Sequence, residues 1–234
     1  MKALLYKEFR LAMHPICYVF MFAFPLMILI PSYPIGIGFI YILSCYPILF
    51  LGANKGQQSN DLLYSTLLPI RKKDIVKARI FTVLVMQLIF IILMSALSPL
   101  SALVQQNLNA QAAATGAKVD QIPGLPLTGF VSVLAFGIVG FAVADIIFFP
   151  IYYKNGRSIV LSTILMILGF AVYILIFTVV IPYIPIIGEP YKNFLCDSGL
   201  GIQFGLLGGA IVVSALLHYL IYKISSERLE KVDF

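Results

Sequence analysis

The run IVLSTILMILGFAVYILIFTVVI, residues 159–181, decides the fold class, because it is apolar on every helical face and carries no charged residue. A helix needs about 20 such residues to cross roughly 30 Å of hydrocarbon. A strand of an outer-membrane barrel would instead alternate apolar and polar residues over about 10 positions. The run therefore predicts a transmembrane helix.

The rest of the chain repeats this pattern. Hydrophobic residues make up 61% and charged residues 11% of the 234 positions, which is more apolar surface than one soluble domain of this length can bury. We expect an all-α integral membrane protein, with residues 1–234 forming a single transmembrane domain of six helices. The predicted spans are approximately residues 16–31, 34–53, 80–104, 127–152, 158–183 and 200–222.

The distribution of basic residues predicts the orientation. If the N-terminus is inside, 14 of the 16 Lys and Arg residues fall in cytoplasmic segments and only Lys118 and Lys192 fall outside. Short cytoplasmic loops carry such an excess of Lys and Arg. Both termini of this multi-pass chain are therefore expected in the cytoplasm, and the net charge of +6 is explained without a nucleic-acid partner.

Residues 1–13 predict a short helix at the inner membrane interface. Leu4, Leu5 and Phe9 lie near one helical face, which would sit in lipid, while Lys7 and Glu8 lie elsewhere. The alternative is a simple extension of the first span. The interfacial helix is favoured because His14-Pro15 marks a break.

The long third span is expected to continue through an Ala- and Gln-rich segment towards Gly116. The sixth span carries Gly201, Gly205 and Gly209 at four-residue spacing, which would permit close packing of another helix.

Asp145 in the fourth span is the one carboxylate expected at membrane depth. Charge there is costly and normally faces protein or water, so Asp145 is a possible intramembrane polar site for a substrate or a coupling proton. The favoured interpretation is structural: Asp145 lies near the inner interface and pairs with a basic loop residue.

Motifs for self-contained catalysis are absent from the sequence. It has no GxxxxGK[ST] phosphate loop, HExxH, Cys-x-x-Cys or GxSxG. His14 and His218 are interpreted as polar interface residues, and the three cysteines lack metal-ligand spacing. We expect no catalytic residues, no metal site and no directly bound cofactor.

The segment 54–79, NKGQQSNDLLYSTLLPIRKKDIVKAR, is the longest strongly polar stretch and is predicted to be the first cytoplasmic loop. It reads as a short amphipathic helix that begins near Asp61 and ends at Pro69, followed by a second helix that enters the third span. A solvated basic loop would need no such apolar pattern. We therefore interpret the loop as a docking element.

The same loop carries a family resemblance. Asp61, Tyr64, Leu67-Leu68-Pro69-Ile70, Ile75-Val76 and Ala78-Arg79 resemble the D-x-x-x-x-x-LP-[IV]-[ST]-R-x-x-I-V-x-[AG]-K signature of small bacterial ABC transporter permeases of the ABC-2 type. The opening MKALLYKEFRL and the turn Phe149-Pro150-x-x-Tyr153-Lys154-x-Gly156 are also similar to this family. The chain departs from the pattern at Arg71-Lys72, where Ser/Thr-Arg is usual, and at Arg79, where Lys is commoner.

The resemblance implies a permease in the bacterial cytoplasmic membrane that pairs with a second permease chain, identical or related. Separate ATP-binding subunits would hold ATP and magnesium and dock on a coupling helix in the first loop. On this resemblance, the docking residues are Asp61, Tyr64, Leu67, Leu68, Pro69 and Arg71.

The cargo implied by the resemblance is an amphipathic peptide, such as a cytolytic or antimicrobial peptide, exported from the cell. A lipid or drug cargo is an alternative. Two further alternatives are an ion-coupled secondary transporter that uses Asp145 and a structural membrane anchor for a cytoplasmic complex.

Overall fold

The computed structural model describes residues 2–12, 15–26, 29, 70–115, 127–155, 159–184, 186, 188 and 199–231. Within these ranges the regular secondary structure is helical and no strand occurs. The all-α prediction is therefore confirmed for the part of the chain that the structure describes. The predicted span 34–53 and residues 54–69 of the polar loop lie outside it.

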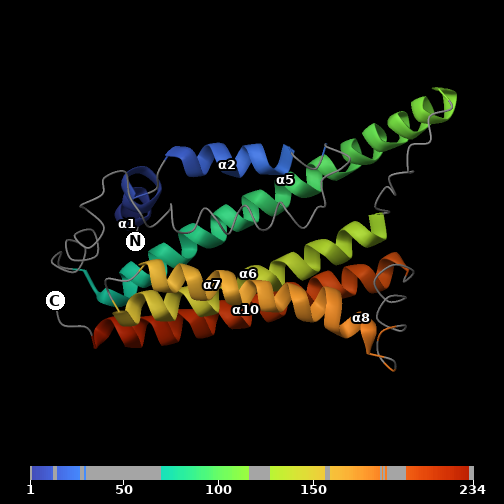
Figure 1. Ribbon diagram of the computed structural model, residues 1–234. Helices are drawn as coiled ribbons and strands as arrows, with labels where there is room; N and C mark the ends of the chain where they lie inside the picture. The colour runs from blue at the N-terminus through green and yellow to red at the C-terminus, as the bar shows by residue number, and fades with distance from the viewer. Residues whose placement is uncertain are drawn as a thin grey trace.

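Among the elements that the structure describes, four long helices pack together, and consecutive ones run in opposite directions (Figure 1). α6 packs against both α7 and α10 along most of its length. Within the described ranges, three segments are long and apolar enough to cross a membrane: Lys72–Gln111, Phe130–Lys154 and Leu200–Glu230. This supports the membrane-protein class. The four helices are α5 (Lys72–Thr115), α6 (Leu127–Asn155), α7 (Ile159–Leu175) and α10 (Leu200–Glu230).

The predicted fifth span, 158–183, is one helical segment with a change of helix type. The 17 residues of α7 continue into a π-helical turn, η3 (Ile176–Val180), and then into the short α8 (Ile181–Tyr183). The backbone of Ile184 is extended, with φ −74° and ψ 118°, and this ends the segment.

α5 is longer than the predicted span 80–104 at both ends. Its 44 residues correspond to about 66 Å of helix, roughly twice the thickness of the hydrocarbon layer. Residues 72–79, at the end of the polar loop, form its first two turns. The Ala- and Gln-rich residues carry it to Thr115, as expected, because both residue types favour helix.

The N-terminal segment packs on the start of α5 rather than lying free in lipid. It forms α1 (Lys2–Lys7), the π-helical η1 (Glu8–Ala12) and α2 (Pro15–Leu26). The break predicted at His14-Pro15 falls at residues 13 and 14, which lie outside the described residues. Leu4, which was expected to face lipid, is buried in a cluster with Ile75 and Ala78 of α5. The expectation is wrong for this residue, because the apolar side chains in the first turns of α5 cover Leu4 in place of lipid.

Close helix packing occurs between α6 and α7, not on the glycine face of α10. A Cβ atom at Gly140 would lie 2.9 Å from Phe170 Cε2, so glycine is needed there for the two helices to approach. Cβ atoms at Gly201, Gly205 and Gly209 would meet nothing within 4 Å. Within the described part of the chain, no helix therefore packs closely against these three glycines of α10.

Candidate functional site

Asp145 lies in the middle of α6 and is fully buried. It precedes Lys154 by nine residues, which is about 14 Å of helix and close to half the thickness of a hydrocarbon layer of roughly 30 Å. The residue also falls inside the membrane-length segment Phe130–Lys154.

Two side chains from other helices contact the same oxygen of this carboxyl. Gln87 of α5 donates a hydrogen bond from Nε2 to Asp145 Oδ2 at 2.9 Å. His218 of α10 places Nε2 2.9 Å from the same oxygen. All three side chains are buried. The expected pairing with a basic loop residue is wrong, because the partners come from α5 and α10.

The second ring nitrogen of His218 has a hydrogen-bond partner of its own. Nδ1 is 2.7 Å from the carbonyl oxygen of Ser214, one helical turn earlier. A carbonyl oxygen can only accept a hydrogen bond, so Nδ1 carries a proton. The contact between Nε2 and Asp145 Oδ2 then needs one further proton, which belongs either to the ring or to the carboxyl group. In both arrangements the Asp145–His218 pair has no net charge.

The other carboxyl oxygen, Asp145 Oδ1, has no hydrogen-bond partner among the described residues. A buried polar atom without a partner costs free energy. The carboxyl group of Asp145 is thus hydrogen-bonded through Oδ2 and not through Oδ1 within the described part of the chain.

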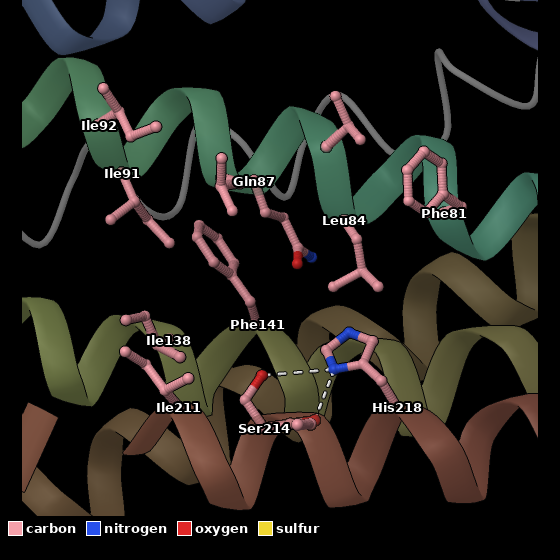
Figure 2. A pocket seen from close by; sticks show the side chains of 13 residues that line it. Phe81, Leu84, Gln87, Ile91, Ile92, Ile138, Phe141, Ile211, Ser214 and His218 are labelled. Atoms are coloured by element: carbon pink, nitrogen blue, oxygen red, sulfur yellow. Dashed lines mark hydrogen bonds between the residues drawn. The ribbon is translucent and has the colours of Figure 1, made fainter. Parts of the chain in front are cut away.

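A partly open cavity of about 680 Å³ lies beside these residues, between α5 and the α6–α10 pair. Figure 2 shows Gln87 reaching down from α5 toward the ring of His218 on α10, with Phe141 of α6 beside them. The lining of the cavity is almost entirely apolar. It consists of Phe81, Leu84, Val85, Gln87, Leu88, Ile91, Ile92, Ile138, Phe141, Ile211, Ser214, Ala215 and His218.

A second buried polar cluster ties the N-terminal segment to the start of α5. Arg79 makes a two-pronged ion pair with Glu8, with Nε 3.0 Å from Oε2 and Nη2 3.2 Å from Oε1. Its Nη1 donates to the hydroxyl oxygen of Tyr152 on α6 at 3.2 Å. Bidentate contacts of this kind fix geometry as well as charge. Glu8, Arg79 and Tyr152 therefore hold η1, α5 and α6 together.

The structure describes two of the sequence-predicted site residues. Arg71 is exposed and directly precedes α5, and Asp145 is at the centre of the buried cluster. The predicted docking residues Asp61, Tyr64, Leu67, Leu68 and Pro69 lie outside the described residues, so their role stays a prediction.

Sequence reasoning missed Gln87 and gave His218 a different role. The available signal was the polar side chain itself, because each lies within a mostly apolar stretch of a membrane-length segment. The same signal marks Gln203, whose Oε1 accepts a hydrogen bond from the Ser132 hydroxyl across the α6–α10 interface.

Among the described residues, no group of three or more His, Cys, Asp or Glu side chains is placed to hold a metal ion. Comparisons with protein-family models, with curated proteins and with solved structures give no match to this chain.

Proposed function

We propose that the chain is the membrane-spanning permease subunit of an ATP-driven exporter of amphipathic molecules. Two permease chains would form the path, and separate ATP-binding subunits would hydrolyse ATP and act on the first cytoplasmic loop. The sequence resemblance to ABC-2 type permeases motivates the proposal.

The observation that carries the proposal is the continuity between the loop signature and α5. The signature ends at Arg79, and α5 already begins at Lys72. Eight residues after Arg79 the same helix presents Gln87 to Asp145. A displacement of the loop would therefore be carried along a continuous helix to one wall of the cavity.

The buried part of the signature explains how the start of α5 resists bending. Ile75, Val76 and Ala78 are fully buried, and Arg79 is held by Glu8. Because these contacts join η1 and α5, the two elements should move together when force is applied to the loop. Rigid elements of this kind are what transmit a conformational change between distant sites.

A transport assay in liposomes tests the proposal. We expect an ATP-binding subunit encoded beside this chain's gene, and the two are co-expressed, purified together and reconstituted. Efflux of a fluorescent amphipathic peptide should require both proteins and ATP. ATP-independent efflux by this chain alone, or failure of the two proteins to copurify, would contradict the proposal.

The Asp145–His218 pair favours a second candidate, an ion-coupled carrier. A buried pair that shares one proton in the middle of the membrane could load and release protons during transport. In that case a pH gradient would drive cargo movement without any ATP-binding subunit, and Asp145→Asn would abolish it. The same liposomes, given a pH gradient in place of ATP, separate the two candidates.

A further inference from the structure

We propose that the cavity between α5, α6 and α10 binds a single-chain amphiphile with an uncharged hydroxyl or amide head. The apolar chain would lie along α5, and the head would sit against Gln87, Ser214 and His218. This inference names a cargo class and a binding site, and so it rests on the proposed function only in calling the ligand a cargo.

The size of the cavity suits a small ligand. The cavity measures about 680 Å³, within the range of sites for small ligands, about 300–1,000 Å³. A single hydrocarbon chain with a small head fits this space.

The arrangement of the lining orients such a ligand. Phe81, Leu88, Ile92 and Ile211 line the cavity and are largely exposed at its edge, so the entrance is apolar. The polar members of the lining are neighbours: Gln87 and His218 contact the same oxygen of Asp145 from opposite sides of the cavity, and the Ser214 hydroxyl lies 3.3 Å from His218 Nδ1 (Figure 2). A ligand that entered from lipid would place its chain among the apolar side chains and its head on these polar groups.

The lining of the cavity carries no net charge, which favours a ligand with an uncharged head. Ten of the 13 lining residues are apolar, and the titratable one, His218, belongs to a pair with no net charge. A charged head at this depth would lose its hydration without gaining a counter-charge, which is strongly unfavourable. A hydroxyl or amide head can both donate and accept hydrogen bonds, so it matches the Ser214 hydroxyl and the Gln87 amide. Both ring nitrogens of His218 already have partners, so the ring provides a wall of the site.

The position of the polar groups also distinguishes this ligand from a bilayer phospholipid. Gln87 lies eight residues beyond Arg79, which is about 12 Å along the helix. A phospholipid keeps its charged head at the interface, so it would present only acyl chain at this depth. An amphiphile with an uncharged head can follow the cavity to the polar groups.

Photolabelling of the purified chain in phosphatidylcholine nanodiscs tests the inference, with no ATP and no partner subunit present. The probe is hexadecanol with a diazirine in its chain. We expect labelling at residues 81–92 and 211–218, and at least a fivefold reduction by excess 1-hexadecanol. Hexadecanoate and hexadecyltrimethylammonium at the same concentration should reduce labelling less than twofold.

Ala215→Phe fills the cavity mouth, and its matched control is Leu216→Phe. Both positions are exposed on α10, but only Ala215 lines the cavity. Size-exclusion chromatography verifies that both variants fold. Ala215→Phe should lower labelling at least fivefold, whereas Leu216→Phe should leave it unchanged.

Three results would overturn the inference. These are equal labelling of the two variants, labelling spread over all lipid-exposed helices, and labelling that charged competitors reduce as much as 1-hexadecanol does. Because the assay needs neither ATP nor transport, its failure would leave the exporter proposal standing. A failed transport assay would likewise leave the binding site standing.

Discussion

His218 on α10 and Asp145 on α6 meet through Nε2 and Oδ2 at 2.9 Å, 73 residues apart in the chain. One proton between them leaves the pair without net charge, and Gln87 adds a hydrogen bond to the same oxygen. Three helices therefore share one buried polar centre beside the apolar cavity.

Replacing only one member of the pair should be more harmful than replacing both. His218→Leu leaves a buried carboxyl group without its proton partner, and breaking a buried pair in this way costs about 3–5 kcal/mol. The double variant Asp145→Leu/His218→Leu removes both polar groups and should recover a large part of that loss. Unfolding in mixed micelles with increasing dodecyl sulfate measures the free energies.

The control is the single variant Asp145→Leu, which completes a double-mutant cycle. Effects of the two single substitutions that simply add in the double variant would mean that the pair does not couple α6 to α10.

The buried contact between Glu8 and Arg79 predicts that the attachment of the N-terminal segment to α5 depends on the geometry of the ion pair as well as on its charge. Arg79→Lys keeps the charge but loses the two-pronged contact, so α1 and η1 should detach more readily from α5. Hydrogen exchange of backbone amides in residues 2–12 should then rise at least tenfold. The exposed ion pair of Lys73 with Glu230 provides the control, and Lys73→Arg should leave this exchange unchanged.

The sequence was sufficient to predict the class of fold and to single out Asp145, but it did not identify the residues that contact Asp145. Long uncharged runs dictate membrane-length helices, and a carboxylate inside such a run is recognisable in itself. Which residue faces Asp145 depends on how α5, α6 and α10 rotate and pack. Gln87 and His218 lie 58 and 73 residues away, so no local pattern links them. Leu4 illustrates the same limit, since helical periodicity identifies an apolar face without identifying the surface that covers it.

Two glycines predict opposite outcomes for the same substitution. Gly140→Ala would bring a Cβ to 2.9 Å from Phe170 Cε2 and 3.1 Å from Tyr173 Cε1, and overpacking of this kind costs about 1–3 kcal/mol. Gly205→Ala meets nothing within 4 Å and should stabilise α10 by up to about 1 kcal/mol through helix propensity. Thermal unfolding of the two variants measures the difference. Similar shifts in the same direction would contradict the α6–α7 packing.

The coupling role proposed for the first cytoplasmic loop predicts a defect in energy transfer rather than in folding or cargo binding. Leu68→Asp places a charge on the apolar side of the predicted docking helix, and Leu67→Asp combined with Pro69→Ala also removes its predicted end. Either variant should lower ATP-driven efflux at least tenfold while hexadecanol photolabelling stays within twofold of the unchanged chain.

Glu227→Gln, a substitution near the end of α10 and away from this loop in sequence, is the control and should transport normally. Because α5 continues from the loop to Gln87, an intact cavity with lost transport would mean that force no longer reaches the helix. Normal efflux together with normal copurification of the ATP-binding subunit would rule out the loop as the coupling element.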